Sequence, residues 1–370
     1  PKRAIKRSAA TPILLNLSLI AALLLMARFG WRDGRALAWA LAAAGIAQFL
    51  WLLAACARAG VRLRLRPPRL TAGVRKTLKI MAPGVLGAGV TQLNLLISTA
   101  LASLLPGGSV SFLYYADRLN QLPLGVVGIA VATAILPPLS RQVRTGDGAG
   151  AAATQNRGVE LALLLTLPAA LALIVLARPI LSVLFERGAF GPAEAAATAA
   201  ALAAYAAGLP AFVLVKVLAP GFFARQDTAT PVKIAIAAMA TNLVLTVLLM
   251  QLWAHIGVAM ALSLAGWVQA LSLLGLLMRR GHFQLDGRAR RNLPLIAAAA
   301  LAMAGFVLLL RRLLGTALAA PSLLRPAVLA GLVAAGALAF LALIIALGVT
   351  DWRELKRRLV PRPGAGGQPA

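Results

Sequence analysis

Apolar runs of about 20 residues recur along the whole chain, and the segments between them hold most of its charges. A helix of about 20 residues crosses a hydrocarbon core of about 30 Å. The alternating segments of about 10 residues that build a membrane β-barrel do not occur in the sequence. The chain is 61% hydrophobic and only 13% charged, which is too little charge to cover a water-facing surface. We therefore predict an all-α protein, a polytopic bundle of transmembrane helices.

The apolar pattern predicts about ten spans. They cover residues 9–29, 36–57, 78–103, 119–140, 158–177, 196–217, 232–252, 255–277, 293–310 and 326–348. With the N-terminus placed in the cytoplasm, 27 of the 37 Lys and Arg residues fall on the cytoplasmic side and nine on the other, while Lys216 lies inside a span. Short cytoplasmic loops are enriched in Lys and Arg, so this asymmetry predicts that both termini are cytoplasmic. It also explains a net charge of +27 without nucleic-acid binding.

Several kinds of chemistry are missing from the sequence. No phosphate-binding GxxxxGK[ST] motif and no HExxH motif occurs. One cysteine, Cys56, excludes an intrachain disulfide, and His255 and His282 are predicted to be solvated loop residues. None of the ten acids lies in the middle of a predicted span, although proton-coupled exporters and membrane transferases use such acids. The sequence therefore favours a protein that is not an enzyme.

The charges at or within spans are cationic. Arg118 follows Asp117 at the outer end of the fourth span, and Lys216 lies within the sixth. Intramembrane cations commonly face a cavity or an anionic partner, and guanidinium and ammonium groups both bind phosphate. The alternatives are that Arg118 extends past Tyr114 and Tyr115 to the interface or pairs with Asp117, and that Lys216 extends to the nearby cytoplasmic end.

Three long stretches carry a resemblance to a known family. They are MAPGVLGAGVTQLNLLISTALAS, SVSFLYYADRLNQLPLGVVGIAVATAILPPLSRQ and KVLAPGFFARQDTATPVKIAI. In sequence and order they resemble the MurJ (MviN) family of lipid II flippases, part of a superfamily of polysaccharide and multidrug exporters. The resemblance implies a two-lobed transporter of fourteen helices in the bacterial inner membrane. Such a transporter would carry lipid II, the undecaprenyl-pyrophosphate-linked peptidoglycan precursor, from the inner to the outer leaflet for cell-wall biogenesis and cell shape.

The ten predicted spans are similar to the family's last ten, so we expect a truncated first lobe. The chain opens on Pro1 without an initiator Met, which also predicts a fragment of a longer protein. The resemblance divides the chain into five parts. They are a two-helix remnant of the N-terminal lobe (1–57), a basic cytoplasmic linker (58–77), a C-terminal six-helix lobe (78–279), a helix pair forming a groove for the lipid tail (293–348) and a basic cytoplasmic tail (349–370).

The resemblance also implies site residues. The Arg of the family's Tyr-Ala-Asp-Arg-Leu stretch lines the central cavity and is needed for flipping, and here it is Arg118. The predicted substrate-binding residues are Arg118, Asp117, Lys216 and Gln121. Some members bind sodium near an Asn of the helix that matches the seventh span, where this chain has Asn242 and Thr246. That span has no Asp, so the sodium ligand set looks incomplete, and no other cofactor is expected.

Two alternatives remain at this stage. The first is an exporter of another lipid-linked oligosaccharide or of a drug; a buried acid in a cation-poor cavity would favour the drug. The second is a truncated membrane scaffold that does not transport, because a chain lacking half of one lobe is not expected to alternate access alone. The expected partners are lipid II and membrane lipids, with no nucleic acid. Nothing in the sequence indicates an oligomeric state.

Overall fold

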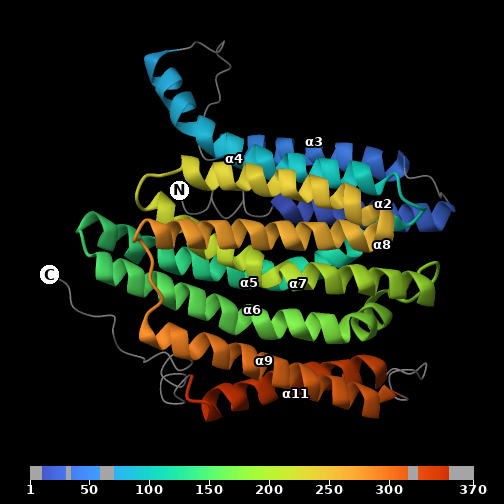
Figure 1. The fold of residues 1–370 in the computed structure, drawn as a ribbon. Helices are drawn as coiled ribbons and strands as arrows, with labels where there is room; N and C mark the ends of the chain where they lie inside the picture. The colour runs from blue at the N-terminus through green and yellow to red at the C-terminus, as the bar shows by residue number, and fades with distance from the viewer. Residues whose placement is uncertain (1–10, 31–34, 59–70, 316–323, 350–370) are drawn as a thin grey trace. The chain divides into compact units, whose positions relative to one another are not determined.

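The computed structural model describes residues 11–30, 35–58, 71–315 and 324–349, and within them every regular element is an α-helix (Figure 1). This confirms the predicted all-α class. The helices are α2 (Thr11–Phe29), α3 (Arg35–Arg58), α4 (Ala72–Ala102), α5 (Ser109–Arg144), α6 (Gly148–Phe185), α7 (Pro192–Phe223), α8 (Ala229–Arg279), α9 (Gly287–Leu313) and α11 (Leu324–Ala346). The chain divides into two compact units, Pro1–Lys76 and Thr77–Ala370.

Seven of the described helices are long and apolar enough to cross a membrane: α3, α5, α6, α7, α8, α9 and α11. The protein is therefore a multi-pass membrane protein. Most helices exceed the predicted spans, and α5 begins at Ser109, ten residues before the expected 119. The predicted linker 58–77 lies mostly, and the tail 349–370 almost entirely, outside the described residues. The five-part division of the chain stays a prediction.

In the first unit, α2 packs against α3. Ala44 and Ala55 are buried in α3, whereas large apolar side chains such as Leu24 and Trp39 are exposed, at 66% and 77%. Large apolar groups on the outside are typical of a surface that meets lipid rather than water.

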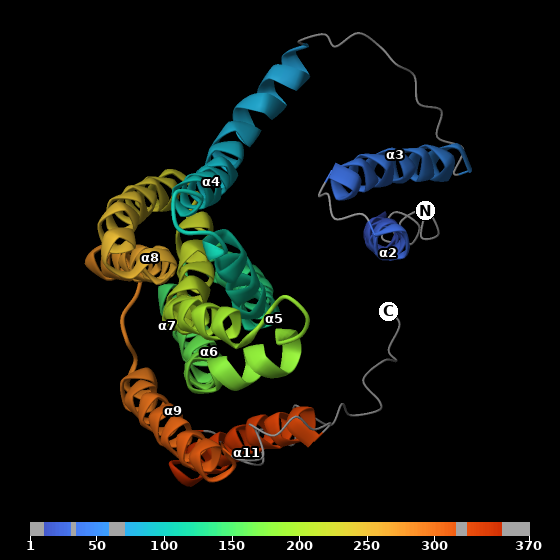
Figure 2. The same cartoon turned by 90° about the vertical axis from the view of Figure 1, so that its right-hand side faces the viewer.

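In the second unit, α7 lies at the centre, packed against α5, α6 and α8 (Figure 2). Its sequence is rich in Ala and Gly, which lets neighbouring backbones come close. At Gly208 an added Cβ would lie 2.8 Å from the Cα of Ser263 on α8, so only Gly fits there. The Ser263 hydroxyl donates a 2.6 Å hydrogen bond to the carbonyl of Ala204 at the same contact.

The 51-residue helix α8 is two helices joined by a sharp turn. Trp253 and Ala254 have non-helical dihedral angles, and the chain reverses there, so residues 229–252 form a first half and residues 255–279 a second half. A Cβ on Gly257 would lie 2.2 Å from the Leu249 carbonyl oxygen, so the turn depends on this glycine. The two helices predicted at 232–252 and 255–277 are confirmed.

The pair α9 and α11 packs on α6 through a shared apolar cluster that includes Leu176, Ile296 and Leu332. Arg311, near the end of α9, donates a 2.6 Å hydrogen bond to the carbonyl of Val175. Pro179 cannot donate the backbone bond that would satisfy this carbonyl within α6, so Arg311 supplies the missing donor.

Two local predictions are wrong. The pattern of residues 178–192 predicts a short interfacial helix with Leu184 and Phe185 facing lipid. Instead α6 continues to Phe185, whose ring lies 5.0 Å from that of Tyr115, and of the two side chains only Leu184 is exposed, at 40%. His255 was expected in a solvated loop, but its Nε2 lies 3.0 Å from the Ala197 carbonyl oxygen. The Phe185 and His255 side chains each contact a residue of another helix, and residue type alone does not predict such a contact.

Candidate functional site

Polar residues of the second unit gather on one face of α4, α5, α7 and α8, where two cavities adjoin. The first, here the Lys216 cavity, has a volume of about 340 Å³ and is lined by Asp117, Asn120, Gln121, Leu124, Gly125, Phe212, Lys216 and Leu262. The second, here the Tyr205 cavity, has a volume of about 370 Å³ and shares Asp117, Gln121 and Leu262 with the first. It extends to Asn94, Ser98 and Tyr114. We call these linings together the cavity face.

Asp117 and Gln121 lie one turn apart on α5, and the Gln121 amide donates a hydrogen bond to the Asp117 carboxylate. No ion pair joins Asp117 to Arg118 in the part of the chain that the structure describes. The amide therefore holds the acid at the boundary of the two cavities. The structure brings together three of the four predicted substrate-binding residues, Asp117, Gln121 and Lys216, in one cavity.

The Lys216 side chain crosses from α7 to the backbone of α5. A Cβ on Gly128 would lie 2.9 Å from Lys216 Cδ and 3.2 Å from Nζ, so the absent side chain of Gly128 makes room for the lysine. Among the described residues Lys216 has no hydrogen bond or ion pair, and it lines the cavity that contains Asp117. An ammonium group that lies against a neighbouring helix and forms no ion pair can bind an anion.

Arg118 lies beside the cavities without lining either one. Its side chain is exposed, and its guanidinium carbon lies 4.8 Å from the centroid of the Tyr114 ring, a cation–π geometry. Tyr114 in turn lines the Tyr205 cavity. Within residues 71–315 and 324–349 no hydrogen bond or ion pair engages the guanidinium, so its donors are available to a ligand.

Sequence reasoning missed two polar residues of this face. Asn120 is 1% exposed, its Oδ1 has no hydrogen-bond partner, and it lines the Lys216 cavity. Tyr205 is 7% exposed and lines the neighbouring cavity. Their only signal in the sequence is a polar group within an apolar span.

The two predicted sodium ligands lie in a buried polar cluster between α4 and α8. The Asn242 amide donates to Asn94 Oδ1 at 2.7 Å and to Ser98 Oγ at 3.2 Å. Asn242 Oδ1 and Thr246 Oγ1 are buried without a partner. The described residues contain no cluster of three or more His, Cys, Asp or Glu side chains. Asn242 and Thr246, one helical turn apart on α8, thus present two buried neutral oxygens that no described residue engages.

A second polar cluster lies at the end of the unit where α6 and α9 begin, and we call it the paired cluster. Arg157 bonds both Glu160 and Asp286, and the Asn292 amide also donates to Glu160. Arg288 approaches Glu160 at 3.6 Å, and Asp286 caps α9 by accepting from the Ala289 N–H at 2.7 Å. No pattern in the sequence indicates that Glu160 and Asp286, more than 120 positions apart, share one arginine.

Asp227 and Arg280 form a further ion pair at the same end, with Arg280 Nη1 2.7 Å from Asp227 Oδ2. Hydrogen bonds from the side chain of Thr230 and from Arg280 lower the pKa of Asp227 to about 2. The pair joins the α7–α8 turn to the end of α8.

Comparison with known proteins places these features in context. A family profile described as "Lipid II flippase MurJ" matches residues 6–329. The probable lipid II flippase MurJ of Rhizobium meliloti (strain 1021) is 43% identical over 359 residues, covering 95% of this chain and 66% of that protein. That of Rhizobium tropici is 40% identical over 306 residues, covering 82% and 57%. This chain thus spans less than two thirds of the length of either relative.

A solved structure, "Lipid II flippase MurJ, inward closed conformation", matches with a TM-score of 0.75 over 95% of this chain and 68% of that one. At 23% sequence identity this match shows a similar fold.

Proposed function

The chain belongs to the lipid II flippase MurJ family, and from that premise we propose that its cavity face binds the anionic head of lipid II during translocation between leaflets. The observation that carries this proposal is the pair of unpartnered cations. Arg118 and Lys216 form no ion pair and no hydrogen bond in the described part of the chain, and a pyrophosphate is an anion that both could bind.

Each residue has a distinct proposed role. Stacking on Tyr114 holds the Arg118 guanidinium with its edge available for bidentate bonds to phosphate oxygens. Lys216 supplies a point charge deeper in the lobe, across Gly128. The bonded pair of Asp117 and Gln121 presents acceptors and donors suited to the sugar and peptide groups of the head.

The proposed mechanism needs no covalent chemistry, and the protein is not an enzyme. The head crosses through a hydrated cavity while the polyprenyl tail stays in lipid, and two lobes expose the cavity first to one side and then to the other. The basic loops favour a bacterial inner-membrane protein with both ends of this chain in the cytoplasm. A membrane potential biases each charged step by about 2.3 kcal/mol per elementary charge and 100 mV.

A sodium ion is part of the proposal. Asn242 and Thr246 would hold it through their unpartnered oxygens, next to Asn94 and Ser98. The ion would supply positive charge that draws the oxygens of α4 and α8 together, and so would favour one arrangement of the two helices.

A drug exporter is not favoured by the family assignment, and the cavity agrees with that. A drug exporter would have a buried acid in a cavity with few cations. Here the acid Asp117 is hydrogen-bonded by Gln121, and the cavity it lines also contains the cation Lys216.

Replacing Arg118 tests the proposal most directly. In the full-length protein, Arg118→Ala is expected to abolish growth of a strain depleted of its own flippase, with unchanged protein abundance in the membrane. Arg118→Lys is expected to be impaired as well, because an ammonium cannot form the bidentate contact. The matched control is Arg312→Ala, an exposed arginine at the end of α9, which should support growth. Normal growth with Arg118→Ala would refute the assignment.

A further inference from the structure

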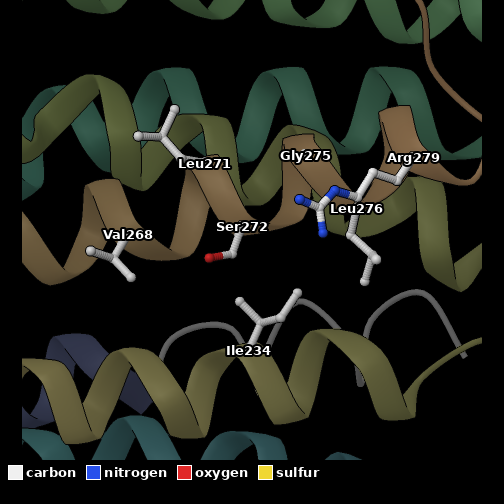
Figure 3. A pocket seen from close by; sticks show the side chains of 7 residues that line it. All are labelled: Ile234, Val268, Leu271, Ser272, Gly275, Leu276 and Arg279. Atoms are coloured by element: carbon white, nitrogen blue, oxygen red, sulfur yellow. The ribbon is translucent and has the colours of Figure 1, made fainter.

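A third hollow lies on the flank of α8 and shares no lining residue with the cavity face. It is an open groove of about 590 Å³ between the two halves of the helix (Figure 3). It is lined by Ile234 from the first half and by Val268, Leu271, Ser272, Gly275, Leu276 and Arg279 from the second. In Figure 3, Ile234 extends from one wall towards Ser272 and Gly275 on the other.

The groove is open to its surroundings and is not a packing defect inside the protein. Leu271 and Val268 are 57% and 42% exposed. A Cβ on Gly275 would meet no atom within 4 Å, so nothing in the described structure fills the space above it. The helix α8 packs against α7 and α5, whereas α9 packs against α6 and α11. In a membrane, lipid chains cover any part of such a surface that protein leaves open.

One end of the groove is positively charged. Arg279 is exposed and has no hydrogen bond or ion pair in the ranges that the structure describes. Asp227 at the same end is engaged by Arg280 at 2.7 Å and so does not neutralise Arg279. Lys233, next to Ile234 in the chain, is exposed as well. This end therefore attracts an anion.

The length of the groove matches a single leaflet. Val268 and Arg279 are eleven residues apart on one helix, which corresponds to about 16 Å at 1.5 Å per residue. Half of a hydrocarbon core of about 30 Å is about 15 Å. An acyl chain that begins at the headgroup level beside Arg279 would thus end near Val268, at the membrane midplane.

We propose that this groove binds an anionic glycerophospholipid of the leaflet on the side where α9 begins. One acyl chain lies between the two halves of α8, and the phosphate contacts Arg279. A long polyprenyl chain would extend well beyond the groove, so a phospholipid of one leaflet fits its length better. The inference does not depend on the flippase proposal, because it concerns different residues and a different ligand.

Photolabelling tests the proposal on the intact chain. The protein is placed in phosphatidylcholine nanodiscs that contain a small fraction of phosphatidylglycerol with a diazirine halfway along one acyl chain. After irradiation, mass spectrometry of peptides should place the label within residues 268–276. Unlabelled phosphatidylglycerol should displace it, and added phosphatidylcholine should not.

Two variants act on the groove by different routes. Arg279→Gln should lower labelling roughly fivefold, which corresponds to about 1 kcal/mol for one lost contact to an anionic lipid. Gly275→Leu should abolish labelling by filling the groove, and because Gly275 has no neighbour it should do so without disturbing the fold. The matched controls are Arg290→Gln and Gly305→Leu, exposed positions on α9, and both should leave labelling unchanged.

Three results would overturn the proposal. Label spread evenly over all lipid-facing helices, or displaced equally by phosphatidylcholine, would mean that only nonspecific lipid surrounds α8. Displacement by a polyprenyl phosphate but not by phosphatidylglycerol would assign the groove to a substrate tail. Unchanged labelling of both Arg279→Gln and Gly275→Leu would place the bound lipid elsewhere.

Discussion

The paired cluster and the cavity face lie in the same unit, but they differ in whether their buried polar groups have hydrogen-bond or ion-pair partners. In the paired cluster, Glu160 is 7% exposed and is bonded by Arg157 and Asn292. On the cavity face, Lys216 lies in a cavity without an acidic partner among the described residues, and Asn120 Oδ1 is buried with no hydrogen bond. A buried polar group without a partner costs free energy, whereas one with partners stabilises the fold it joins.

This contrast indicates that the paired cluster stabilises the fold, whereas the cavity face is available to bind a ligand. The paired cluster joins α6 to the start of α9, and Arg311 joins the same two helices near the other end of α9. On the cavity face, by contrast, Lys216 and Asn120 Oδ1 have no hydrogen-bond partner among the described residues, so both are available to a ligand. We therefore expect substitutions in the paired cluster to change stability and substitutions on the cavity face to change transport.

The largest effect is expected at the centre of the paired cluster. Glu160→Ala should lower the free energy of unfolding by about 3 kcal/mol, because Asn292 and Arg157 lose a buried acceptor. Thermal and denaturant unfolding in detergent measure this change. The control is Glu186→Ala, whose one ionic contact is 3.9 Å long and whose loss should cost less than about 1 kcal/mol. Equal losses for the two variants would contradict a special role for the cluster.

The cavity face should respond in the opposite way to Lys216→Met. Under the proposed function, flipping by the full-length protein is expected to fall about tenfold, equivalent to about 1.4 kcal/mol, while stability stays the same or rises because an unpaired charge is removed. A flipping assay in liposomes and a melting curve on the same preparation separate the two effects. Gly128→Ala should cause a smaller loss of flipping, because its Cβ would displace the lysine that lies across α5. A fall in stability without a fall in flipping would assign Lys216 to the structure instead.

The same contrast explains how much the sequence could predict. Helices and spans follow from apolar runs, and Arg118, Asp117 and Lys216 stand out because charges are rare in such runs. The paired cluster could not be foreseen, because contacts between Glu160 and the start of α9 depend on how distant helices pack. Asn120 and the contact of His255 with Ala197 were missed for the same reason, since neither residue has a spacing that indicates its neighbour.

A third substitution tests whether the unpartnered oxygens near α4 hold a cation. Thr246→Val removes a buried hydroxyl that has no partner and keeps the side-chain shape, so without sodium it should raise stability by about 1 kcal/mol. The wild type should melt at a higher temperature in sodium than in potassium, because a ligand bound to the folded state stabilises it. The variant should lose that difference. A sodium effect that persists in Thr246→Val would exclude this oxygen as a ligand.

The smallest effect is expected at Asp227, the exposed counterpart of the paired cluster. Its pKa is about 2 in the folded protein, because Thr230 and Arg280 donate hydrogen bonds to its carboxylate. In the unfolded chain the pKa of an Asp is about 3.9. A lowered pKa stabilises the folded state above about pH 4, and this contribution disappears as the pH falls from about 4 to 2. The partners Arg280 and Asp227 are 39% and 26% exposed, so solvent screening keeps the contribution below about 1 kcal/mol. Asp227→Asn should therefore lower stability slightly at pH 6 and not at pH 2, and high salt should reduce the difference at pH 6.

A difference in stability between the wild type and Asp227→Asn that is the same at both pH values would show that the carboxylate charge plays no part. The ion pair would then act only as packing, unlike its buried counterpart at Glu160.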